Sequence, residues 1–96
     1  MANPATLKMR VHRARKRAEE NLRNVGYGVF HTDGGLFDLI AVRESDARFI
    51  CVMSEKIDRE QMIRATNRCL EIKVPRNCQR EIWVCSGGKN FTIAIL

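Results

Sequence analysis

Apolar residues recur at helical spacing through the first part of the chain. Between Leu7 and Val25 they return every three or four positions, and on a helical wheel they form one narrow stripe. We expect Thr6 to cap the start of this helix and Gly26 to end it in a left-handed conformation. The pattern therefore predicts one long amphipathic helix whose apolar stripe packs against the rest of the domain.

Three strand-like runs follow this helix, and short polar or glycine-containing segments separate them. The runs are residues 27–31, 36–42 and 48–53. Because such short connections join neighbouring strands as hairpins, we expect antiparallel pairing. The second and third runs are almost wholly apolar, which favours a sheet that is covered on both faces.

A second helix and two further strands complete the pattern. Asp58 is placed to cap a helix that runs to about Leu70, and Gln61 completes a capping-box spacing. Residues 81–85 and 91–96 have the composition of strands, and a turn joins them. The predicted fold class is α/β, with the order αβββαββ in a mixed sheet flanked by helices.

The composition is that of one globular domain over residues 1–96. Of these 96 residues 45% are apolar and 29% are charged, which is ordinary for a small domain with one core. No apolar run is long enough to span a membrane and no secretory signal is visible, so we expect a cytoplasmic protein without a membrane partner. The four cysteines lack the spacing of a zinc site, and reduced thiols are expected.

Positive charge is concentrated on the first helix. The formal net charge is +6, which favours a polyanionic partner, with nucleic acid first. Cations near a helix N-terminus oppose the helix dipole and repel one another, a cost that an external anion would offset. We therefore interpret this face as a contact surface for nucleic-acid phosphates, whereas the alternative is a solvated face that only aids solubility. The cations are Lys8, Arg10, Arg13, Arg15, Lys16 and Arg17.

Asp38 is the single carboxylate in the apolar run 36–42. A buried carboxylate needs a partner, a proton or a metal ion. Hard divalent cations such as Mg²⁺ bind carboxylate oxygens, which makes Asp38 a candidate metal ligand. The alternative is a structural aspartate that is hydrogen-bonded to a neighbouring loop.

The order and spacing of several segments resemble the PD-(D/E)xK nuclease superfamily. Within it, the chain is most similar to archaeal Holliday junction resolvases and their small phage and plasmid relatives. The resemblance implies a restriction-endonuclease-like core, branched or duplex DNA as the partner, and a homodimer. The segments that carry it are Gly26-Tyr27 and residues 37–41, 49–53, 74–77 and 80–84.

The resemblance also implies a catalytic centre that this sequence retains only in part. In the family, an aspartate and a glutamate on adjacent strands hold Mg²⁺, and a lysine two residues after the glutamate acts on the attacking water. Asp38 matches the aspartate, but Cys51 stands at the glutamate position and Met53 at the lysine position. Arg15 stands where a helix glutamate often completes the site. Sulfur groups are poor ligands for Mg²⁺, so Asp38 is expected to be vestigial and to bind metal weakly.

We therefore expect a nucleic-acid-binding protein with a degenerate, inactive nuclease centre and no certain cofactor. One alternative is an active nuclease that uses Mg²⁺ and in which the missing groups have moved to Glu19, Glu55 or Lys56. A second alternative is a protein-interaction module on the same fold. His31 either approaches a phosphate or hydrogen-bonds within its loop, and the E-x-K triplet at residues 71–73 is interpreted as coincidental.

Overall fold

The computed structural model describes residues 4–32, 36–54, 56–86 and 90–96, with side chains from Val11 onward. The element order is α1, β1, β2, β3, α2, β4, β5, which confirms the predicted α/β class and the αβββαββ order. The elements are α1 (Pro4–Asn24), β1 (Gly28–His31), β2 (Leu39–Arg43), β3 (Asp46–Ser54), α2 (Arg59–Glu71), β4 (Cys78–Cys85) and β5 (Phe91–Ile95).

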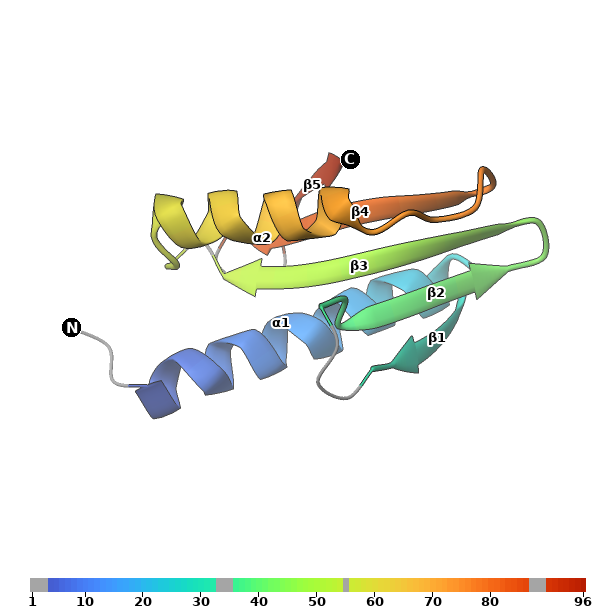
Figure 1. The fold of residues 1–96 in the computed structure, drawn as a ribbon. Coiled ribbons are helices and arrows are strands. Elements are labelled where there is room, and N and C mark those ends of the chain that lie inside the picture. Colours follow the sequence, from blue (N-terminus) through green and yellow to red (C-terminus); the bar gives the residue numbers. More distant parts are fainter. Residues whose placement is uncertain (1–3, 33–35, 55, 87–89) are drawn as a thin grey trace.

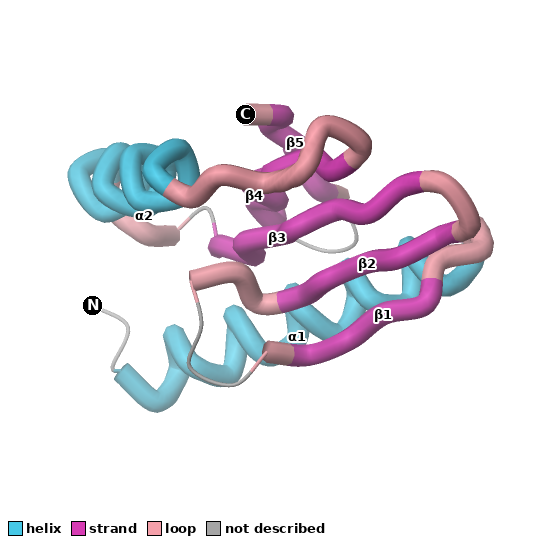
Figure 2. The backbone as a smooth tube through the Cα atoms, turned by 45° about the vertical axis from the view of Figure 1, so that its right-hand side comes forward, coloured by secondary structure: helices cyan, strands magenta, loops and turns pink. Residues whose placement is uncertain are grey.

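The strands form one mixed sheet in the order β1-β2-β3-β4-β5. The first three strands pair antiparallel, as the short connections predict, and β4 pairs antiparallel with β5. β3 and β4 run parallel, and α2 is the crossover between them. Figure 2 shows the strands side by side with the two helices away from the sheet plane.

α1 and α2 lie on opposite faces of the sheet (Figure 1). Alternate residues of β3 face the two helices, because side chains alternate along a strand. Ile50 and Val52 belong to the core cluster that contains Ala18 of α1, whereas Cys51 belongs to the cluster that contains Cys69 of α2. β3 is therefore covered on both faces, as predicted.

The prediction of two covered faces is wrong for β2. α2 packs against the β4 side of the sheet because it has to deliver the chain to that strand. The α2-side face of β1 and β2 consequently stays open, and Phe30 and Val42 are exposed on it by 61% and 42%.

The two ends of α1 follow from local sequence. The helix begins at Pro4, so Thr6 lies inside it and is not its cap, contrary to the prediction. Proline suits the first turn because its φ is preset and it has no N–H to leave unpaired. At the other end Gly26 has φ +94°, and Tyr27 N–H donates to the Leu22 carbonyl at 3.0 Å. This is the glycine-terminated ending that the sequence predicts.

α2 begins as predicted, because the Asp58 carboxylate accepts a hydrogen bond from Gln61 N–H at 2.8 Å. Its face toward the sheet includes Cys69, which is buried, whereas Leu70 is 48% exposed. No helix in the described ranges is long and apolar enough to cross a membrane.

Candidate functional site

The sequence predicts Asp38 within a strand, but Asp38 lies directly before β2. Its N–H donates to the Ile50 carbonyl at 2.8 Å, so the backbone still pairs with β3 at this point. Two residues further along β3, Val52 N–H donates a hydrogen bond to the Asp38 carboxylate at 2.6 Å. The side chain therefore provides the partner that Val52 N–H would otherwise lack at the point where β2 begins.

Arg15 of α1 supplies the countercharge to this carboxylate. Its Nη2 atom lies 2.7 Å from Asp38 Oδ1. Arg15 follows Ala14, which is buried in the core, so it leaves α1 at the margin of the apolar stripe and reaches along the sheet. The Asp38 side chain is 13% exposed and that of Arg15 is 43% exposed. A buried carboxylate needs a partner, a proton or a metal ion, and the fold gives Asp38 a partner, the Arg15 guanidinium.

Cys51 lies beside this pair, and its side chain is buried. Burial raises the pKa of the Cys51 thiol to about 12, and the nearby Asp38 carboxylate acts in the same direction. Burial also raises the pKa of Cys69, which packs in the same cluster. A thiol in this state stays protonated, so it is a poor nucleophile at neutral pH.

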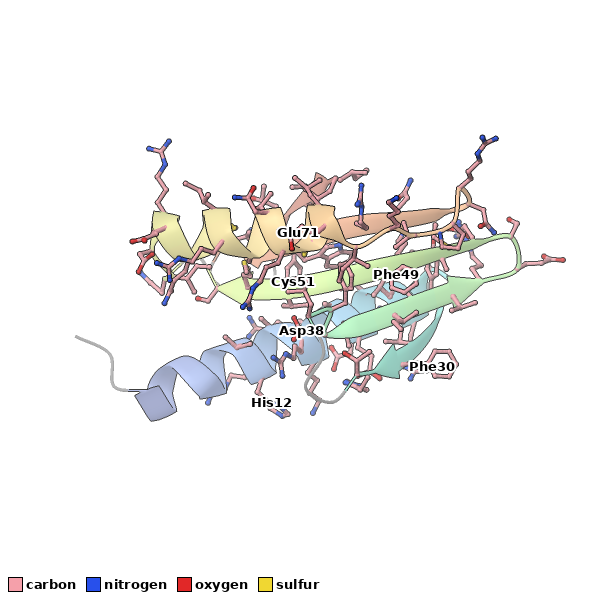
Figure 3. The ribbon with its side chains drawn as sticks, in the orientation of Figure 1. His12, Phe30, Asp38, Phe49, Cys51 and Glu71 are labelled. Carbon is pink, nitrogen blue, oxygen red and sulfur yellow. The ribbon has the colours of Figure 1, made fainter. Side chains whose placement is uncertain are left out.

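The structure thus brings together Arg15, Asp38 and Cys51, three of the positions that the resemblance aligns with a catalytic centre (Figure 3 labels Asp38 and Cys51). Within the described ranges, no group of three or more His, Cys, Asp or Glu side chains is placed to hold a metal ion. One carboxylate with a guanidinium on it and a protonated thiol do not make an oxygen-rich Mg²⁺ site. The residues present therefore do not fit Mg²⁺.

The side chains considered as relocated catalytic groups lie in other surroundings. Glu19 Oε1 lies 3.0 Å from Arg23 Nη2, and Glu19 Oε2 lies 2.9 Å from His31 Nε2. The hydrogen bond from Arg23 lowers the pKa of Glu19. His31 is thus hydrogen-bonded within the fold. Lys56 is exposed in the turn after β3, and Glu55 is outside the described residues.

The described side chains of α1 also include cations that do not pair with Glu19 or Asp38. Arg13 and Lys16 are exposed and Arg17 is half-buried. In the described part of the chain, none of these three side chains forms an ion pair. Glu20 is the acidic side chain exposed on α1. The side chains of Lys8 and Arg10, also predicted to bind nucleic acid, lie outside the described ones.

A cavity of about 470 Å³ lies between α2 and β3. Cys51 and Met53 line it from β3, and Arg68 and Glu71 line it from α2. Glu71 is the last residue of α2, so Glu71 and Lys73 do not share a strand face as the family motif requires. The triplet at residues 71–73 therefore lacks the geometry of a catalytic E-x-K motif.

The carboxylate of Glu81, which is more deeply buried than that of Asp38, was not identified from the sequence. Glu81 of β4 is 1% exposed, and it accepts a hydrogen bond from the Trp83 indole N–H at 2.9 Å. Arg48 Nε lies 3.5 Å from the other Glu81 oxygen. The available signal was the spacing, because Glu81 stands two residues before Trp83 and alternate residues of a strand share a face.

Comparison with known proteins gives no family assignment. No protein-family model matches the chain, and neither any characterised protein nor any solved structure matches it. The fold and the site together define an α/β protein with a cationic first helix and a carboxylate that the same helix neutralises.

Proposed function

We propose that the protein binds nucleic acid through the phosphate backbone, with the solvent face of α1 as the contact surface. The observation that carries this proposal is that the cations of α1 fall into two groups, those paired within the fold and those facing solvent. Arg15 and Arg23 turn toward acidic side chains of the fold, whereas Arg13 and Lys16 face solvent without an ion-pair partner among the described residues. Cations that the fold does not use are available to displace counterions from phosphates.

The ion pair between Arg15 and Asp38 supports a binding role without cleavage. A PD-(D/E)xK centre needs carboxylates that are free to hold Mg²⁺, and here the Asp38 carboxylate already has a guanidinium and a backbone N–H. Contacts to phosphates position a protein on its partner but read no bases. We therefore expect recognition of the shape of duplex or branched DNA, largely independent of sequence.

Fluorescence anisotropy with labelled duplex, single-stranded and four-way-junction DNA tests this proposal. The test variant carries Arg13→Ala and Lys16→Ala. Its matched control carries Lys73→Ala and Arg76→Ala, which removes the same charge from exposed positions outside α1. The test variant should bind more weakly and its salt dependence should fall by about 2 in slope, because each phosphate contact contributes about 1.

Two further results sharpen the interpretation. Glu20→Gln should strengthen binding, because it removes the exposed acidic side chain of the contact surface. Incubation with Mg²⁺ or Mn²⁺ should leave all strands intact. Equal losses in the test and control pairs would mean that net charge alone drives binding, and the α1 surface would no longer be supported.

A protein-interaction module is the second candidate, and the open sheet face favours it. Phe30 of β1 and Val42 of β2 are exposed on the part of the sheet that α2 leaves uncovered, and Figure 3 shows Phe30 at the β1 edge. If this face serves binding, the protein should enhance the fluorescence of a hydrophobic dye, and Phe30→Lys should reduce the enhancement more than Ile63→Lys does on α2. Absence of DNA binding at low salt together with that result would favour this candidate.

A further inference from the structure

β5 is an edge strand of the sheet that the described residues form. Its residues, Phe91–Ile95, include no charge and no proline, and its register with β4 is continuous, without a bulge. Ile93 and Ile95 are 44% and 65% exposed. An uncharged, apolar edge strand offers unpaired backbone groups to another strand.

The opposite edge of the same sheet is protected. β1 has only four residues, and the Val29 carbonyl accepts a hydrogen bond from Arg23 Nη2 at 3.2 Å. The same arginine pairs with Glu19, which also binds the His31 side chain at the end of β1. Side chains of α1 therefore occupy the β1 edge, whereas β4 is the one strand of the described sheet that pairs with β5.

The outward backbone groups of β5 can be assigned from its pairing with β4. Leu96 N–H donates to the Arg80 carbonyl at 2.9 Å, and the Asn90 carbonyl accepts from Ser86 N–H at 3.1 Å. Even-numbered residues of this segment thus direct their backbone groups to β4. Because this direction alternates along a strand, the N–H and C=O groups of the odd-numbered residues, Ile93 among them, point away from the sheet.

We propose that a second copy of this chain pairs antiparallel with β5 about a two-fold axis at Ile93. In that register Ile93 lies opposite the same residue of the second copy, and Phe91 lies opposite Ile95 of that copy. All three have outward backbone groups, so every directly opposite pair of this set is a hydrogen-bonded pair. Aromatic and β-branched residues are favourable cross-strand neighbours.

Self-pairing is favoured over pairing with a different protein by the symmetry of the strand. An antiparallel arrangement about Ile93 matches apolar residues with apolar residues in both copies, as a closed two-fold interface requires. Two chains of net charge +6 repel each other wherever their basic surfaces meet. The charge-free β5 edge lets them approach through backbone hydrogen bonds.

This pairing has a geometric consequence for α1. Directly opposite residues of an antiparallel pair point to the same face, so the two copies would form one continuous sheet with both α1 helices on one face. The inference itself does not depend on nucleic-acid binding, because it concerns only the β5 edge.

The test compares Ile93→Lys with Ile63→Lys under reducing conditions by sedimentation equilibrium. Ile63 lies on α2 with 50% exposure, so the control makes the same substitution at a similarly exposed site. The native chain should reach twice its 11.0 kDa mass with rising concentration. Ile93→Lys should raise the dissociation constant by about tenfold or more, because a charge at the edge opposes its own copy, whereas Ile63→Lys should leave it unchanged.

Hydrogen exchange on the native chain gives a readout that needs no variant. The Ile93 amide should gain protection as concentration rises, whereas the Ala94 amide, which faces β4, should be protected throughout. A native chain that stays monomeric overturns the proposal. So does a dimer that Ile93→Lys leaves intact with an unprotected Ile93 amide, because the copies would then meet through another surface.

Discussion

The guanidinium of Arg15 and the carboxylate of Asp38 lie 2.7 Å apart and connect α1 to the start of β2. Val52 N–H binds the second carboxylate oxygen, so β3 joins the same contact. Three elements that meet at the candidate site are thus held by one aspartate. The pair gives the carboxylate its countercharge from within the chain.

The contribution of this pair to stability is measurable by urea denaturation. Arg15→Gln should lower the free energy of unfolding by about 1 kcal/mol, since the pair is partly exposed and water screens it. Arg13→Gln is the control, because Arg13 is exposed on the same helix without an ion-pair partner among the described side chains. Equal losses for the two variants would contradict a specific role for the Arg15 contact.

Cys51 should resist alkylation in the folded protein. Its thiol is buried and its pKa is raised to about 12, so the reactive thiolate is scarce at mildly alkaline pH. Cys78, which is only partly buried, should react with iodoacetamide well before Cys51. Mass spectrometry of digested protein reports both sites, and urea should make them equally reactive. Rapid labelling of Cys51 without urea would show that the site opens readily.

Removal of Arg48 should destabilise the fold far more than removal of Arg43. Arg48 is the cation beside the Glu81 carboxylate, which is almost completely buried, whereas Arg43 pairs with Asp46 at the surface. Arg48→Met leaves that charge uncompensated and should cost about 3 kcal/mol in the free energy of unfolding. Arg43→Met should cost about 1 kcal/mol or less. Similar losses would mean that water reaches Glu81.

Tyr27→Phe should weaken the acid dependence of stability. The Tyr27 hydroxyl donates to Asp46 Oδ2 at 2.6 Å, and this hydrogen bond lowers the pKa of Asp46 in the folded state. A lowered carboxyl pKa contributes stability that is present above the unfolded-state pKa and is lost as pH falls through the folded-state pKa. The unfolding curves of the two proteins should therefore differ at neutral pH and converge in acid.

NMR titration of the Asp46 carboxyl carbon checks the cause directly. Its midpoint should move up toward the ordinary range in Tyr27→Phe, because the hydrogen bond that lowers it is gone. An unchanged Asp46 midpoint would show that the neighbouring arginines, Arg43 and Arg48, and not the hydroxyl, lower its pKa.

Restoring carboxylates around Asp38 should create a metal site. Arg15→Glu combined with Cys51→Asp places two more oxygen donors beside Asp38, on the positions that the resemblance assigns to acidic residues. Mn²⁺ binding, measured by electron paramagnetic resonance, should appear in this variant and disappear again on adding Asp38→Asn. A folded variant that binds no Mn²⁺ would count against the family resemblance.

Local interactions account for what could be predicted about the elements. The apolar period of α1 placed Ala14, Ala18 and Leu22 on one stripe, and all three are buried. Gly26 and Asp58 end and begin helices where their backbone and side-chain chemistry predicts. Such features depend on hydrogen bonds between near neighbours, so the sequence alone is sufficient to locate them.

The partners of the buried charges were decided by the tertiary structure. The sequence by itself determined that a carboxylate at Asp38 needs compensation, since burying an unpaired charge is costly anywhere. Only the docking of α1 on the sheet brought Arg15 to it, and only the parallel register of β3 and β4 brought Arg48 to Glu81. Periodicity and the cost of burial are properties of residues and near neighbours, whereas the choice of partner depends on how distant segments pack together.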